Sequence, residues 1–178
     1  RDLGMDDYLN DGVMAAVDAV SAIVPLQRIQ AVGYCLGGTL LAIAAAAMAR
    51  DDDNRLRTLT LLAALVDFTE PGELGLFIDD SQLSYLDDMM SEQGYLDGKQ
   101  MAGAFALLNQ RDLVFSRMVH DYLMGERAPV TDLAAWNADA TRMPFRQHTD
   151  YLHSLYSRNA LAAGRYRVGG KPVALSDI

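Results

Sequence analysis

The segment that most constrains the fold is Gly33-Tyr34-Cys35-Leu36-Gly37, which holds the only cysteine of the chain. The apolar run from Arg28 to Tyr34 predicts a short buried strand before it, and the run from Gly37 to Arg50 predicts a helix after it. A nucleophile with glycines two positions away on either side, between a strand and a helix, is typical of a sharp turn that lifts its side chain above a parallel sheet.

The residues around Cys35 have physical reasons to be there. The backbone of such a turn is strained, and we expect Gly33 and Gly37 to crowd the neighbouring strand and helix, where a Cβ would not fit. Gly38 is expected to let the start of the helix pack closely. Free N–H groups at a helix start stabilise a thiolate, and the N–H of Leu36 is placed to stabilise an oxyanion. The alternative is a small, unreactive cysteine inside a core.

The pattern around this turn predicts an α/β core. Acidic residues begin a helical repeat from Asp6 to Ile23, which Pro25 ends. After the alanine-rich helix and a turn at residues 51–54, the run from Leu56 to Leu65 predicts a second strand. Helix, strand, helix and strand in this order indicate a parallel sheet with flanking helices.

The rest of the chain is predicted to be a helical insertion followed by a hairpin. The candidate helices are Ser81–Gln93, Gly98–Leu108, Asp112–Met124 and Gln147–Ala163, with a looser stretch from Ala128 to Met143. Two short alternating runs meet at Gly169-Gly170 and predict a hairpin. We therefore expect three parts: a partial core over residues 1–66, a helical cap over 67–164, and a return hairpin over 165–178.

Composition excludes several classes of partner. With 15 basic and 24 acidic residues the net charge is −9, which disfavours nucleic acid and anionic membrane surfaces. The longest apolar stretch is too short to cross a bilayer, and a single cysteine cannot form an internal disulfide. A cytoplasmic protein is the natural interpretation.

A cysteine nucleophile also favours one substrate class. Attack on a thioester such as an acyl-CoA exchanges one thioester for another, so the acyl group stays activated for transfer to a hydroxyl. A serine would form an oxygen ester and lose much of that potential. The thiol therefore suits acyl transfer from thioesters better than hydrolysis.

Several stretches resemble the polyhydroxyalkanoate synthases, which are cysteine enzymes with an α/β-hydrolase fold. The resembling stretches are DDYLNDGVMAAVDAV, VGYCLGGTLLAIAAA, LTLLAALVDFTEPGELGLFID, RDLVFS, DYLMGERAP, DLAAWNADATRMP and NALAAGRYRVGGKPVALSDI. They extend over nearly the whole chain. One departure from the family pattern is Arg111, which stands where the family has Asn.

The resemblance implies an acyltransferase that polymerises (R)-3-hydroxyacyl-CoA into polyester and releases CoA through a covalent cysteine acyl-enzyme, with no cofactor and no metal. Cys35 matches the family nucleophile, and Leu36 the residue whose amide holds the oxyanion. The resemblance places the triad Asp and His after Ile178. We therefore expect residues 1–178 alone to be inactive. The resemblance also implies a homodimer located at polymer granules in the cytoplasm.

Other residues are candidates for the cap entrance or a channel wall. Asp67 is interpreted as an anchor at the cap entrance. Trp136, Asn137 and Asp139 are interpreted as a packed, structured turn, with a wall of the substrate or product channel as the alternative. We expect surface or polar-core roles for the three histidines, His120, His148 and His153.

Two other functions stay open. The first is a cysteine hydrolase of the dienelactone hydrolase type, which carries a similar Gly-Tyr-Cys-x-Gly-Gly segment. The second is a non-catalytic module that dimerises or associates with polymer granules.

Overall fold

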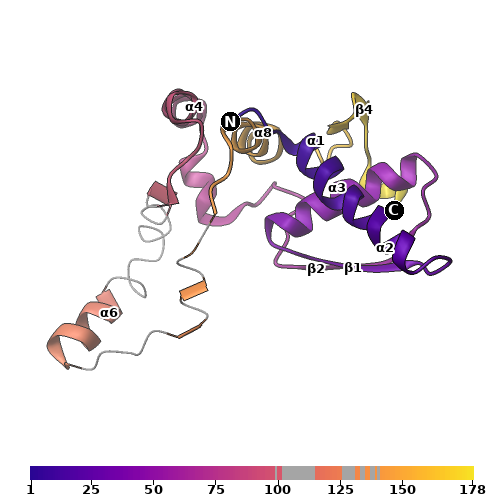
Figure 1. Ribbon diagram of the computed structural model, residues 1–178. Helices are drawn as coiled ribbons and strands as arrows, with labels where there is room; N and C mark the ends of the chain where they lie inside the picture. The colour runs from indigo at the N-terminus through magenta and orange to yellow at the C-terminus, as the bar shows by residue number, and fades with distance from the viewer. Residues whose placement is uncertain (99, 102–114, 126–130, 133–134, 137–138, 140) are drawn as a thin grey trace.

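The computed structural model describes residues 1–178 except 99, 102–114, 126–130, 133–134, 137–138 and 140. The described part combines helices with a small parallel sheet and a short hairpin (Figure 1). Its helical segments are α1 (Met5–Asp7), η1 (Tyr8–Met14), α2 (Ala15–Ile23), α3 (Leu36–Arg50), η2 (Gly72–Phe77), α4 (Asp80–Gln93), α6 (Ser116–Met118), η4 (Val119–Leu123), α8 (Phe145–Asp150), η5 (Tyr151–Ser157) and η6 (Leu175–Asp177). Its strands are β1 (Ile29–Tyr34), β2 (Leu56–Leu62), β3 (Arg167–Val168) and β4 (Lys171–Pro172).

The first helical repeat forms as predicted. Segments α1, η1 and α2 follow one another without a break, and the middle one has π-helical hydrogen bonding. At the start, the Gly4 N–H donates to Asp7 Oδ2 at 2.7 Å, which satisfies one of the free N–H groups of the helix end. The helix stops before Pro25, and Leu26 turns the chain with a φ of 68°.

The predicted parallel sheet is confirmed. Strands β1 and β2 pair in parallel, with Val32 opposite Thr60, and α3 is the connection between them. Strand β2 ends at Leu62, three residues before the predicted Leu65. The cause is Ala63, whose φ of 48° is incompatible with an extended strand.

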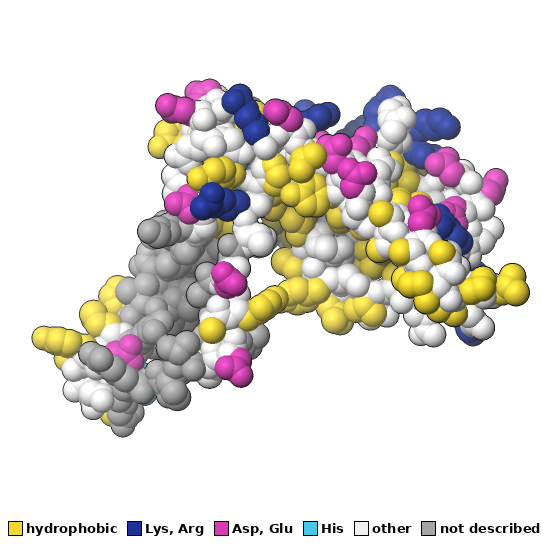
Figure 2. Space-filling model, in the orientation of Figure 1, with side chains coloured by type: hydrophobic (Ala, Val, Ile, Leu, Met, Phe, Trp, Pro, Cys, Tyr) yellow, Lys and Arg dark blue, Asp and Glu magenta, His cyan; other side chains and the backbone are white. Residues whose placement is uncertain are grey.

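Strand β1 is not the buried strand that its composition predicts. Val32 is 66% exposed and Tyr34 is 65% exposed. The helices of the described part cover one face of the sheet, and the side chains of β1 that alternate onto the other face are left open (Figure 1). Hydrophobic side chains are accordingly visible along the sheet side of the surface (Figure 2).

The core lies on the covered face of the sheet and centres on α3. The alanines of α3 bring the neighbouring segments close, and Ala44 and Ala46 are fully buried. They pack against Met5, Leu155 and Val173, which come from α1, η5 and the segment after β4. Segments far apart in the sequence therefore share one core.

The later predictions hold in part. Helix α4 confirms the predicted helix at Ser81–Gln93, and the hairpin of β3 and β4 turns at Gly169 and Gly170, whose φ values are 58° and 77°. The helix predicted at Gln147–Ala163 begins earlier, at Phe145, and ends at Ser157, because Asn159 takes a φ of 45°.

Much of the predicted insertion lies outside the described residues. This applies to most of Gly98–Leu108, to the start of Asp112–Met124 and to parts of Ala128–Met143. In the described remainder of Asp112–Met124, α6 and η4 confirm a helix. The three-part division stays a prediction. Among the helices that the structure describes, none has the length and apolar character to span a membrane.

Candidate active site

Cys35 sits on the bend between β1 and α3. Its φ of 52° and ψ of −128° are strained for a residue with a side chain, and its side chain is exposed. Hydrogen bonds fix the bend from both sides: the Cys35 N–H donates to Leu62 O at 2.9 Å, and the Gly38 N–H donates to Cys35 O at 2.9 Å. The sulfur is thus presented at the end of the strand rather than inside the core.

The expected crowding occurs at two of the three glycines. A Cβ on Gly33 would lie 2.5 Å from the Cα of Gly38, and a Cβ on Gly38 would lie 2.5 Å from the Cβ of Ala64. A Cβ on Gly37 would meet nothing within 4 Å in the described part of the chain. The close strand–helix contact therefore uses Gly38, and the steric reason predicted for Gly37 is wrong.

Leu36 is the first residue of α3, directly after Cys35. The N–H groups of a first helical turn have no acceptor within the helix, and the helix dipole gives that end a partial positive charge. The Leu36 N–H is such a group, and it can donate a hydrogen bond to an anion that forms next to the sulfur of Cys35. The catalytic roles of Cys35 and Leu36 stay predictions.

Two tyrosines that sequence reasoning missed, Tyr151 and Tyr156, are affected electrostatically by Cys35. Burial is the main cause that raises the pKa values of Tyr151 and Tyr156, and negative charge at Cys35 raises both further. Their ring centroids lie 5.3 Å apart, and that of Tyr156 lies 4.8 Å from that of Phe68 in an edge contact. Phe68, Tyr151 and Tyr156 therefore form an aromatic cluster, and Cys35 is close enough to the two tyrosines to affect their pKa values.

The spacing explains why this pair was missed. Tyr151 and Tyr156 are five residues apart, which a regular α-helix does not place on one face. Segment η5 is π-helical, and its i to i+5 hydrogen bonding makes five residues about one turn. The sequence signal was two tyrosines in one helix, but the local helix type was needed to use it.

Asp67 ties the chain after β2 to the end of η5. Its Oδ1 accepts from the Thr69 N–H at 2.9 Å, from Thr69 Oγ1 at 2.6 Å and from Asn159 Nδ2 at 2.7 Å. These donors, the Thr69 hydroxyl first, lower the pKa of Asp67. The contacts suit the interpretation of Asp67 as an anchor between two distant segments.

The proposed channel residues are only partly described. Trp136 is 69% exposed, so its ring is not packed into a turn within the described part of the chain. Asp139 is also exposed, and Asn137 lies outside the described residues. A channel role for Trp136, Asn137 and Asp139 stays a prediction.

Two histidines lie between α4 and the helix formed by α8 and η5. His153 Nε2 is 2.7 Å from Asp87 Oδ2, and the Thr149 hydroxyl donates to Asp87 Oδ1 at 2.7 Å. His148 is buried, its Nδ1 has no partner in the described part, and burial lowers its pKa. No cluster of potential metal ligands occurs among the described residues.

Comparisons with known proteins show a consistent similarity, although no family model matches the chain. It is 38% identical over 178 residues to a poly(3-hydroxyalkanoate) polymerase of Methylorubrum extorquens, which covers 100% of this chain and 29% of that protein. It is 39% identical over 171 residues to the poly(3-hydroxyalkanoate) polymerase subunit PhaC of Rhizobium meliloti, covering 96% and 28% respectively. Against the PhaC subunit of Cupriavidus necator the identity is 31% over 179 residues, covering 97% and 30%. The chain thus spans less than a third of the length of these relatives.

Proposed function

We propose, from the premise that this chain belongs to the poly(3-hydroxyalkanoate) polymerase family, that it carries the nucleophile of a polyester-forming acyltransferase. The observation that supports this best is Cys35 itself. It is exposed, it has a positive φ, and it stands at the start of a 15-residue helix. A strained backbone at an exposed thiol is what a nucleophile on such a bend requires, whereas a packing cysteine has no need of it.

The proposed reaction has two acyl transfers. The thiolate of Cys35 attacks the thioester carbonyl of an (R)-3-hydroxyacyl-CoA, the Leu36 N–H donates to the oxyanion, and CoA leaves as a thiolate that takes up a proton. The hydroxyl of another hydroxyacyl unit then attacks the acyl-cysteine. An ester forms, the bond from sulfur to carbon breaks, the hydroxyl proton passes to a general base, and the thiolate is restored.

The aromatic cluster supplies one wall of the proposed acyl site. The phenols of Tyr151 and Tyr156 are neutral at ordinary pH, their raised pKa values extend that range, and the two hydroxyls share a hydrogen bond. The ring of Phe68 packs edge-on against both. We propose that the two hydroxyls orient the incoming acyl or hydroxyl oxygen while the rings limit access of water.

The general base is proposed to be a histidine outside this stretch, oriented by an aspartate. His148 is buried, and His153 contacts Asp87 of α4, whereas the residues of their helix that Cys35 affects are Tyr151 and Tyr156. Neither histidine is therefore assigned the role. In this proposal residues 1–66 are part of an α/β-hydrolase core, residues 67–164 a cap, and residues 165–178 a return to the core. The uncovered face of β1 and β2 accords with further helices that cover it in the whole protein, because parallel sheets are normally covered on both faces.

The test compares the protein that carries this sequence with its Cys35→Ala and Cys35→Ser variants. Incubation with 3-hydroxybutyryl-CoA is expected to release CoA, form polyester and leave an acyl group on Cys35, detected by peptide mass spectrometry. We expect Cys35→Ala to abolish all three. Free 3-hydroxybutyrate without polyester would instead indicate a hydrolase of the dienelactone type, and unchanged behaviour of Cys35→Ala would indicate a non-catalytic module.

A further inference from the structure

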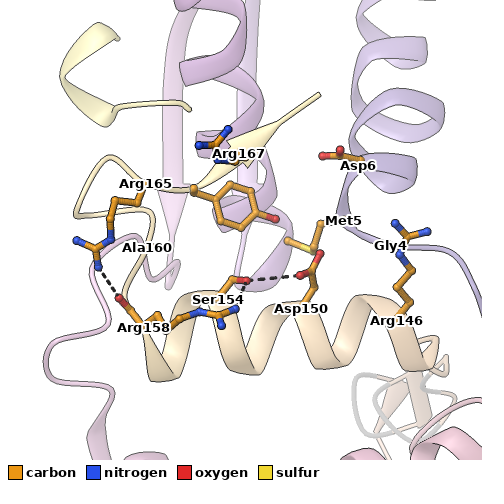
Figure 3. Close-up of a pocket in the computed structure, with 11 residues that line it drawn as sticks. Gly4, Met5, Asp6, Arg146, Asp150, Ser154, Arg158, Ala160, Arg165 and Arg167 are labelled. Carbon is orange, nitrogen blue, oxygen red and sulfur yellow. Dashed lines mark hydrogen bonds between the residues drawn. The ribbon is translucent and has the colours of Figure 1, made fainter. Parts of the chain in front are cut away.

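A hollow of about 320 Å³ lies beside the helix formed by α8 and η5, between it, α1 and the β3–β4 hairpin (Figure 3). Cationic side chains dominate its lining. Four arginines and two aspartates contribute to it: Arg146, Arg158, Arg165, Arg167, Asp6 and Asp150. In a chain with a net charge of −9, such a concentration of positive charge calls for a reason.

The four guanidinium groups bond to neutral acceptors. Arg146 donates to Asp2 O at 3.2 Å, and Arg158 donates to Ser154 Oγ at 3.2 Å. Arg165 donates to the carbonyl oxygen of Arg158 at 3.1 Å, and Arg167 donates to Gly170 O at 2.7 Å. These bonds hold the side chains in place without neutralising them.

The two aspartates do not cancel this charge. Asp6 Oδ2 accepts from the Gly169 N–H at 3.4 Å, and Asp150 Oδ1 accepts from Ser154 Oγ at 3.5 Å. No ion pair within the described residues joins either carboxylate to an arginine of the hollow. Cationic groups therefore outnumber anionic ones two to one, and each keeps N–H donors for a ligand.

A second hollow on the same molecule gives an internal comparison. Its lining includes Arg28 and Arg57, but also Asp53 and Asp177, so its charges balance. Arg28 also donates hydrogen bonds to two carbonyl oxygens, those of Asn54 and Leu56. The excess of cations is thus a property of the first hollow.

We propose that the hollow lined by Arg146, Arg158, Arg165 and Arg167 is an anion-binding site that takes phosphate groups. Guanidinium groups pair with phosphate through charge-assisted, often bidentate hydrogen bonds. Four guanidinium groups suit a ligand with several oxygen acceptors, such as a phosphate ester or diphosphate, better than a bare halide. The buried residues Met5, Ala160 and Tyr166 give the hollow an apolar part that the organic portion of an ester can contact.

The site is separate from the proposed acyl site. Residues 146, 150, 154 and 158 are spaced four apart and line the hollow, as Figure 3 shows for their labelled side chains. Tyr151 and Tyr156, on the same helix, do not line the hollow, and neither does Cys35. The inference therefore does not depend on the chemistry of Cys35.

The experiment measures binding of inorganic pyrophosphate by isothermal titration calorimetry at low ionic strength, with the protein that carries this sequence. We expect saturable binding that weakens as salt is added. The double variant Arg158→Gln/Arg165→Gln should bind at least about tenfold more weakly, a difference of about 1.4 kcal/mol, because it lacks two of the four guanidinium groups. The matched control Arg57→Gln, in the balanced hollow, should bind as the wild type does.

Two further arms identify the source of the phosphate. If coenzyme A competes with pyrophosphate more strongly than 3′-dephospho-coenzyme A does, the site binds a nucleotide 3′-phosphate. Pyrophosphate that binds more tightly than either would assign it to a free anion. Cys35→Ala should bind like the wild type, which separates this result from the proposed function. No saturable binding, or equal binding by the double variant and the wild type, would overturn the proposal.

Discussion

Gly33 and Gly38 touch across the bend that carries Cys35: a Cβ on Gly33 would lie 2.5 Å from the Cα of Gly38. The pair sets the closeness of β1 and α3, and hence the position of the thiol relative to the helix start. A glycine in position 37, which the spacing of the motif emphasises, has open space around its Cα in the described part of the chain. The contact is made one residue further along, where the helix has turned toward the strand.

Alanine substitutions should separate these glycines. Gly33→Ala and Gly38→Ala force backbone atoms apart, and we expect each to lower the free energy of unfolding by about 1–3 kcal/mol. Gly37→Ala is the matched control and should be neutral or stabilising by up to about 1 kcal/mol, because alanine is the better helix former. Denaturant unfolding measures all three. A loss for Gly37→Ala as large as that for Gly33→Ala would contradict the assignment.

The bend and its flanking elements could be predicted from the sequence because their signals are local. A short apolar run, a nucleophile between glycines and an alanine-rich run each lie within a few residues of Cys35. The exposure of Val32 and Tyr34 could not be predicted, because apolar strand composition does not say which faces are covered. That depends on segments distant in the sequence.

The same limit applies to the arginine-lined hollow and to the tyrosine pair. Arg146 and Arg167 are brought together by the return of the hairpin to the core, which no spacing reveals. Tyr151 and Tyr156 share a side only because η5 is π-helical. The predicted anchor role of Asp67, in contrast, used only its position at the end of a strand.

Removing single hydroxyls should test the tyrosine pair. Tyr151→Phe and Tyr156→Phe keep the rings and the edge contacts but remove the hydroxyls proposed to orient the reacting oxygen. We expect each to slow acyl transfer about tenfold, as the loss of one positioned hydrogen bond does, with little change in stability. Rates of CoA release and melting temperatures give the two readouts. Tyr85→Phe, at an exposed position of α4, is the control, and equal rates in all three variants would exclude the role.

The contacts of Asp87 should hold α4 against the helix formed by α8 and η5. Asp87→Asn weakens the contact with His153 and the acceptance from the Thr149 hydroxyl. We expect the free energy of unfolding to fall by about 1–2 kcal/mol and the amides of α4 to exchange faster. Hydrogen–deuterium exchange with peptide resolution measures this. Asp88→Asn, the next residue and exposed, should leave exchange in α4 unchanged, and an equal effect of the two variants would refute the docking role.

His148 should make stability depend on pH. Its side chain is buried, and burial lowers its pKa below the ordinary 6.5, although the nearby Asp87 acts in the opposite direction. The unfolded chain therefore binds a proton at a higher pH than the folded chain does. The contribution of neutral His148 to the free energy of unfolding is complete above about pH 6.5. It is lost as the pH falls from there toward the lowered pKa of His148 in the folded state. Unfolding free energies between pH 8 and pH 5, about the range in which histidine titrates, should show this decline. His148→Gln cannot take up this proton, so its decline should be shallower, and a variant with the wild-type slope would show that another group causes it.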